Sequence, residues 1–177
     1  MYRRASHGAV AYETSFEPPV FRLLGQDARH RIGAVTSNPF LVALAESWVT
    51  SLGEERVRRA MPMRTYLDHG VPLAGSSDTP VADHDPWVGI HAACARRTEH
   101  GRELDPAERL TAEEAIRSYT RGGAWIIGRD DELGSLEPGK LADLVILADD
   151  PLALPVDELR HVVPEAVMVG GRLVVGE

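Results

Sequence analysis

One carboxylate stands directly after a segment that is expected to be a buried strand. The stretch VPLAGSSDTP (71–80) begins with an apolar run typical of such a strand, which we expect over Val71 to Ser76, and Asp78 follows it. Pro80 has no N–H group to donate to a strand ladder, so the strand must end before it. A carboxylate is costly to bury unless it is paired or binds a metal. Asp78 is therefore either a loop anchor or part of a site.

Composition sets limits on the partners of the chain. The 177 residues are 44% hydrophobic and 26% charged, which is ordinary for one globular domain or two small lobes. A net charge of −8 argues against a nucleic acid or an anionic membrane as partner. No run approaches the roughly 18 apolar residues of a membrane span, and no secretory signal begins the sequence. The single cysteine excludes an internal disulfide, and we expect a cytoplasmic protein.

The elements that must position Asp78 alternate between strand and helix. Ile32 to Val35 is a strand candidate. A helical pattern from Glu54 is broken at Pro62 and resumes as far as Gly70, and the strand ending at Ser76 follows. This order favours parallel strands with helices packed outside them. Residues 1–31 are poorly patterned, and residues 39–53 are expected to form a loop with a short helix.

The later part of the chain changes character near residue 130. A helix beginning near Trp87 is expected to stop at Gly101. A capping box at Thr111 opens another helix, which carries Tyr119 on its apolar side and ends near Gly128. Beyond residue 130 we expect a strand over Leu141 to Leu147 and a β-hairpin over 165–175 that turns at Gly170-Gly171. The sequence therefore predicts an α/β body over 1–130 and a small antiparallel β unit over 131–177.

Three stretches together resemble the C-terminal part of the amidohydrolase superfamily, and in particular its amidohydrolase-3 group of metal-dependent hydrolases. They are SSDTPV (76–81), RLTAEEAIRSYTRGGA (109–124) and LGSLEPGKLADLVIL (133–147), of which the third is the most specific. The resemblance extends in order over residues 32–177. It implies that residues 1–130 are the last βα units of a (β/α)8 TIM-type barrel and that residues 131–177 are part of a composite β-sandwich.

The resemblance also implies a reaction. In this superfamily the aspartate after the eighth strand ligates a divalent metal and exchanges protons with the attacking water, and Asp78 has that position. The implied function is hydrolysis of carbon–nitrogen bonds other than peptide bonds in a small amide-type substrate, with zinc as the first candidate for the metal. Asn38 follows the preceding strand and either contacts substrate or simply forms a turn.

The histidines of the chain depart from the superfamily pattern. There is no His-x-His pair, and a full barrel needs about 250 residues, so the resemblance implies a C-terminal fragment that starts near the sixth strand. His7 is the candidate for the sixth-strand metal ligand. His30 is a weaker one, because Gly33 and Ala34 stand where an acid and a histidine are expected. An upstream half of the barrel or a second copy of the chain would supply the missing ligands.

The remaining chemically active side chains are expected to be structural. His84 fits a solvated loop, His91 a packing or surface position, Cys94 the core, and the arginines of ERVRRA (55–60) a solvated helix face. A nucleotide-binding domain is excluded because no Gly-rich phosphate loop follows a strand. The alternative to a hydrolase is a non-catalytic fragment that acts as a scaffold or interaction module.

Overall fold

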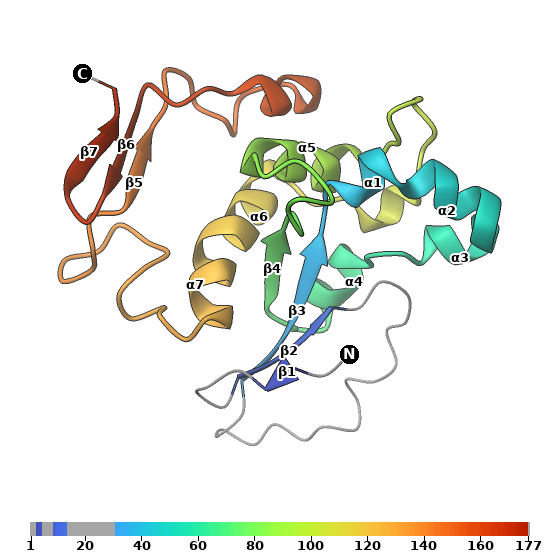
Figure 1. Cartoon of the computed structure of the whole chain (residues 1–177), viewed down its shortest axis with the longest axis horizontal. Coiled ribbons are helices and arrows are strands. Elements are labelled where there is room, and N and C mark those ends of the chain that lie inside the picture. Colours follow the sequence, from blue (N-terminus) through green and yellow to red (C-terminus); the bar gives the residue numbers. More distant parts are fainter. Residues whose placement is uncertain (1–2, 5–8, 14–30, 177) are drawn as a thin grey trace.

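The computed structural model describes residues 3–4, 9–13 and 31–176, and places them in two sheets with surrounding helices (Figure 1). The strands are β1 (Arg3–Arg4), β2 (Ala9–Glu13), β3 (Arg31–Ser37), β4 (Leu73–Ser76), β5 (Leu144–Ile146), β6 (Ala166–Val169) and β7 (Arg172–Val175). The α-helices are α1 (Phe40–Ala43), α2 (Ala45–Leu52), α3 (Glu54–Arg58), α4 (Met63–Asp68), α5 (Pro86–Ala95), α6 (Ala112–Arg117) and α7 (Gly123–Ile126). The 3-10 helices η2 (Pro106–Glu108) and η4 (Val156–His161) and the π-helical turn η3 (Ser118–Gly122) complete the list.

The first sheet has the strand order β1-β2-β3-β4, with β2, β3 and β4 parallel and β1 antiparallel to β2. In Figure 1, α6 and α7 lie beside β4, whereas α1, α2 and α3 extend on the far side of β3. The two parallel strands predicted from the sequence are confirmed. Strand β4 begins at Leu73, two residues later than predicted. The preceding Pro72 still contacts β3, because its carbonyl accepts a hydrogen bond from the Ala34 amide.

The first fifty residues contain more regular structure than the local sequence pattern indicates. Strand β2 lies in the poorly patterned segment 1–31, because its ladder with β3 supplies the pairing that the local sequence does not announce. Residues 39–53, expected as a loop with a short helix, contain the two helices α1 and α2. Leu41 and Ala45 of these helices are fully buried, and the rings of Phe40 and Trp48 pack edge to face at 6.1 Å.

Helix α5 ends at Ala95, so the predicted stop at Gly101 is also wrong. Arg96 adopts a left-handed conformation (φ 45°) and turns its side chain into the core, where it is fully buried. Its guanidinium donates to the carbonyls of Met61 (2.8 Å) and Ala60 (3.1 Å), just after α3. Burial lowers the pKa of Arg96 to about 10, which keeps the side chain charged near neutral pH. This contact joins the ends of two helices that lie far apart in the sequence.

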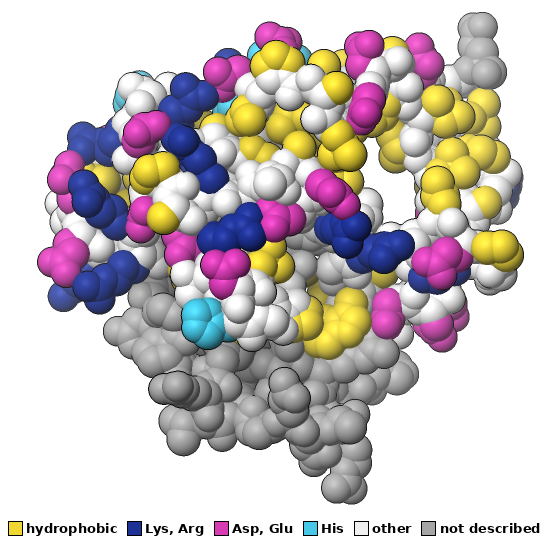
Figure 2. Space-filling model, turned by 180° about the vertical axis from the view of Figure 1, so that it is seen from behind, with side chains coloured by type: hydrophobic (Ala, Val, Ile, Leu, Met, Phe, Trp, Pro, Cys, Tyr) yellow, Lys and Arg dark blue, Asp and Glu magenta, His cyan; other side chains and the backbone are white. Residues whose placement is uncertain are grey.

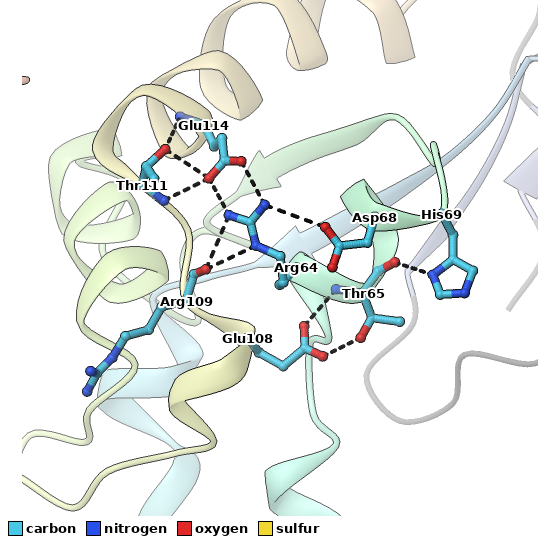
Figure 3. Close-up of polar contacts among 8 residues, drawn as sticks. All are labelled: Arg64, Thr65, Asp68, His69, Glu108, Arg109, Thr111 and Glu114. Atoms are coloured by element: carbon cyan, nitrogen blue, oxygen red, sulfur yellow. Dashed lines mark hydrogen bonds and ion pairs between the residues drawn. The ribbon is translucent and has the colours of Figure 1, made fainter.

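The capping box predicted at Thr111 is present and belongs to a larger polar network (Figure 3). The Glu114 carboxylate accepts a hydrogen bond from the Thr111 amide and also accepts hydrogen bonds from both terminal nitrogens of Arg64, which projects from α4. The Arg64 guanidinium, with further help from Thr111, lowers the pKa of Glu114 to about 2 against the opposing effect of burial. Glu108 accepts from the backbone and hydroxyl of Thr65 beside this pair. The network ties the helix before β4 to the start of α6.

The helix predicted from Thr111 to Gly128 contains a π-helical turn that the sequence pattern did not reveal. Gly122, in this turn, lies against β4: a Cβ atom there would be 2.0 Å from the Leu73 carbonyl oxygen. The neighbouring Gly123 has no atom within 4 Å of such a position. Backbone therefore packs directly on backbone between η3 and β4, at a separation that only glycine permits.

The C-terminal hairpin is confirmed. Strands β5, β6 and β7 form a separate antiparallel sheet, with the turn between β6 and β7 at Gly170-Gly171. Figure 2 shows apolar side chains gathered at that end of the molecule, and exposed members are Leu141, Val145, Ile146, Val169, Leu173, Val174 and Val175. Helix η4, which precedes β6, packs on α5 through the fully buried Leu159. Among the described residues, no helix has the length and apolar character needed to cross a bilayer.

Adjacent glycines give a matched test of the η3–β4 contact. Gly122→Ala is expected to lower the free energy of unfolding by about 3 kcal/mol, because the new methyl group meets a strand carbonyl that cannot move without breaking the ladder. Gly123→Ala is expected to be neutral or to stabilise by up to about 1 kcal/mol, as alanine does in an open helix position. Urea denaturation of both variants measures the difference, and equal effects would contradict the packing.

The Arg64–Glu114 pair predicts a pH-dependent contribution to stability. Glu114→Ala is expected to cost about 2 to 3 kcal/mol at neutral pH, whereas Glu113→Ala, which removes an exposed pair with Arg117, is expected to cost about 0.5 kcal/mol or less. The folded pKa of Glu114 lies below its ordinary value of 4.5, so the contribution is complete above that pH and is lost as the pH falls toward 2. Denaturation curves of the parent and Glu114→Ala should therefore converge over this range. A constant difference between them would count against the ion pair.

Candidate functional site

The C-terminal ends of β3 and β4 lie at the same edge of the parallel sheet. In the ladder, Thr36 faces Gly75 and Ser37 faces Ser76, the last residue of each strand. Asn38 continues from the first strand, and Ser77 and Asp78 continue from the second. Because α/β folds place their sites at the carboxyl ends of parallel strands, these residues form the candidate site.

Asp78 follows β4 as the sequence predicted, and its side chain is exposed. Its backbone is left-handed (φ 54°), a conformation that aspartate tolerates better than most residues. The Val81 amide donates to the Asp78 carbonyl (2.9 Å), and the hydroxyls of Ser77 and Thr79 share a hydrogen bond (2.9 Å). Local contacts therefore hold the loop in a turn and leave the carboxylate accessible from outside.

Asn38 is fully buried at the end of β3, and its side chain has a role beyond the turn. Its carbonyl accepts from the Leu41 amide (3.0 Å) as α1 begins, which is the turn-forming role considered for this residue. Its side-chain Oδ1 accepts from the Thr36 hydroxyl (2.7 Å). The Nδ2 group has no hydrogen bond of normal geometry within the described part of the chain, which is costly for a buried donor.

Tyr119 reaches the same edge from η3, and sequence reasoning assigned it only to the apolar side of a helix. Its hydroxyl donates to the carbonyl of Ser76 (3.2 Å), the last residue of β4. Burial raises the pKa of Tyr119 and the Asn38 side chain opposes this rise, so the amide of Asn38 acts on the phenol. The signal available in the sequence was a tyrosine hydroxyl on a face otherwise expected to be apolar.

The described residues do not complete a metal site. No three His, Cys, Asp or Glu side chains converge within residues 3–4, 9–13 and 31–176, and a catalytic zinc normally has three protein ligands. The groups nearest in the chain to Asp78 at the sheet edge are hydroxyls, which are weak substitutes for imidazole or carboxylate. His7 and His30, the other predicted ligands, lie outside the described residues.

The other side chains singled out from the sequence are either exposed to solvent or buried in the core. His84 is exposed beside Asp83, as expected for a solvated loop, and the arginines of residues 55–60 are also exposed. His91 is buried on α5, with Nε2 3.5 Å from Asp157, and burial lowers its pKa. Cys94 lies in the core as predicted, and burial raises its pKa to about 12, which makes it a poor nucleophile.

A family model described as the amidohydrolase family matches residues 7–175, nearly the whole chain. The chain belongs to this family. The match confirms the resemblance seen in the three sequence stretches, and it includes both strand ends and the C-terminal sheet.

The curated relatives are several times longer than this chain. It is 32% identical over 145 residues to the putative amidohydrolase YtcJ of Bacillus subtilis, which covers 80% of this chain and 27% of that protein. It is 41% identical over 103 residues to the N-substituted formamide deformylase of Arthrobacter pascens, covering 58% of this chain and 19% of that protein. The chain thus spans about a quarter or less of the curated relatives named here.

A solved structure has the same arrangement of elements. The crystal structure of an uncharacterized metal-dependent hydrolase from Pyrococcus furiosus superimposes with a TM-score of 0.63 at 32% identity, covering 82% of this chain and 29% of that one. The fold of most of this chain therefore recurs in a metal-dependent hydrolase.

Proposed function

We propose that the chain forms part of a hydrolase that acts on carbon–nitrogen bonds other than peptide bonds, in a small amide-type substrate. The observation that carries the proposal is an accessible carboxylate, Asp78, at the C-terminal end of a parallel strand in a chain of the amidohydrolase family. The printed function of the Arthrobacter pascens relative, a deformylase of N-substituted formamides, supports an amide-type bond.

The architecture proposed for the whole protein is a (β/α)8 barrel to which residues 1–130 contribute the last units and residues 131–177 part of a sandwich. Three successive parallel strands with helices outside them support this proposal. The described strands cannot close a barrel, so an upstream part or a second copy would supply the rest. The coverage of 29% of the Pyrococcus furiosus hydrolase is consistent with a share of that size.

The role proposed for Asp78 is proton transfer. As water attacks the carbonyl carbon, an exposed carboxylate at the sheet edge accepts the proton from the water and then returns it to the leaving amine. The fixed turn from Asp78 to Val81 suits this role, because it limits the positions that the carboxylate samples. Asn38, which is fully buried at the end of β3, is proposed to lie beside the substrate.

A divalent metal is also part of the proposal, with zinc as the first candidate and the remaining ligands outside the described residues, His7 among them. The support is the printed title of the Pyrococcus furiosus neighbour, a metal-dependent hydrolase. The described side chains do not by themselves complete a metal site, so the remaining ligands would have to come from elsewhere in the protein.

A pair of acid substitutions tests the role of Asp78. In the protein from the longest reading frame that contains this chain, Asp78→Asn is expected to lower kcat on N-substituted formamides or N-acyl amino acids by about 10³-fold. Asp83→Asn, in the same loop, is the control, because its oxygen still accepts the hydrogen bond of the Asp85 amide and activity should stay close to that of the parent. Asp78→Asn with parental kcat would refute the assignment.

The alternative proposal is a non-catalytic scaffold, which the lack of a three-ligand cluster among the described residues favours. For the chain alone we expect neither stoichiometric zinc after dialysis nor hydrolysis of N-acetyl amino acids with added zinc, since a catalytic site needs about three protein ligands. Elemental analysis and the assay measure both. A content near one zinc per chain, lost together with turnover in Asp78→Asn, would show that the chain itself completes the site.

A further inference from the structure

We propose that Tyr119 is a positioning residue that fixes the end of β4 and, through it, the backbone from which Asp78 projects. The proposal rests on the proposed function, in which Asp78 is the reactive carboxylate. Tyr119 lies more than forty residues after β4 in the sequence, yet its hydroxyl donates to the carbonyl of Ser76, two residues before Asp78. No contact between Tyr119 and the substrate is required.

Two glycines make room for the ring at this place. A Cβ atom at Gly75, in β4, would lie 2.3 Å from the ring of Tyr119, and one at Gly89, in α5, would lie 1.8 Å from its hydroxyl oxygen. Real Cβ atoms do not approach so closely, so both positions exclude any side chain. The ring is thus inserted between β4 and α5. These two elements flank the loop that carries Asp78, so the ring contacts the segments at both ends of that loop.

The π-helical turn aims the tyrosine. A π-helical turn inserts an extra residue into a helix and turns the following side chains to a new direction, and such turns are frequent at functional sites. Here η3 spans Ser118–Gly122, so Tyr119 lies within the widened turn and not in a regular α-helical continuation of α6. Gly122, at the other end of the turn, sits on the Leu73 carbonyl and sets how deeply the turn approaches β4.

A buried amide extends the contact to the neighbouring strand. Asn38 is held by the Thr36 hydroxyl at the end of β3, and its Nδ2 donor lacks a hydrogen bond of normal geometry among the described residues. The effect of Asn38 on the pKa of Tyr119 indicates that this amide faces the phenol. Small movements of the ring would let Nδ2 donate to the phenol oxygen while the phenol donates to Ser76. The two strand ends are then linked through one side chain.

The same observations argue against Tyr119 as an acid or base. Its proton is directed at a backbone carbonyl, and burial raises its pKa well above the ordinary value, so the phenol remains a neutral donor at physiological pH. A donor held in this way orients its acceptor and has no proton to exchange with a substrate. Misplacement of a reacting group by about 1 Å can cost about 10²-fold in rate, which gives such positioning a functional consequence.

The test compares Tyr119→Phe with Thr120→Val by NMR on the chain as it stands. Tyr119→Phe keeps the ring and removes the hydroxyl that reaches β4. Thr120→Val removes the adjacent hydroxyl of the same turn, which donates to the Ile116 carbonyl of its own helix (2.9 Å) and does not contact β4 within the part of the chain that the structure describes. Two readouts are local to the proposed contact: the carbonyl carbon shift of Ser76, and amide exchange of Val81, whose N–H closes the turn onto Asp78.

In Tyr119→Phe we expect the Ser76 carbonyl shift to lose its hydrogen-bonded value and Val81 exchange to rise by about tenfold. Exchange of the Arg96 amide, which donates to the Ala92 carbonyl at the end of α5, should stay at the parental rate. In Thr120→Val neither signal should change. If either the Ser76 or the Val81 signal is unchanged in Tyr119→Phe, or if exchange rises equally at Arg96, the positioning role is overturned. These readouts need no activity, so a failure of the proposed hydrolase function leaves the result interpretable.

Discussion

The direct packing of η3 on β4 is the constraint on which the candidate site depends. With a Cβ position on Gly122 only 2.0 Å from the Leu73 carbonyl oxygen, no side chain separates the turn from the strand. The separation of the two elements is therefore set by backbone atoms, which cannot change rotamer. This fixed separation positions the Tyr119 ring, whose hydroxyl donates to the Ser76 carbonyl at the end of β4. The turn that begins at Asp78 follows directly from that strand end.

Charged side chains brace the same region from outside. Arg64 and Glu114 join α4, which leads into β4, to α6, which leads into η3, so that the segments before and after the contact are tied together. Arg96 joins the end of α5 to the carbonyls that follow α3. Each bond links one βα unit to the next across at least thirty residues. The strand end is thus fixed by neighbours from both earlier and later parts of the chain.

What the sequence predicted correctly depends on local rules. The two parallel strands follow from apolar runs, the start of α6 from the Thr111 capping box, and the C-terminal hairpin from Gly170-Gly171. Each of these signals lies within a few residues of the structure it specifies. The place of Asp78 at a strand end was predictable for the same reason, and the family match confirmed the resemblance that made the residue a candidate.

What the sequence did not predict depends on partners distant in the chain. Strand β2 exists through pairing with β3. Helix α5 ends at Ala95, and the guanidinium of the following Arg96 donates to a carbonyl thirty-five residues earlier. The burial of Asn38 and the insertion of Tyr119 between two glycines likewise depend on tertiary contacts, which no local sequence pattern indicates. The functional roles of Asp78, Asn38 and His7 stay predictions, and the last lies outside the described residues.

The central claim is that the Tyr119 ring lies between β4 and α5 and so determines how the strand ends. The most direct measurement is the proton NMR shift of the Hα atoms of Gly75 and Gly89, because an aromatic ring in contact displaces such resonances strongly. The account predicts large ring-current shifts at both glycines and cross-peaks from both to the Tyr119 ring, with neither seen at Gly123, where the packing is open. Unshifted Hα resonances at Gly75 and Gly89, without cross-peaks to Tyr119, would contradict it.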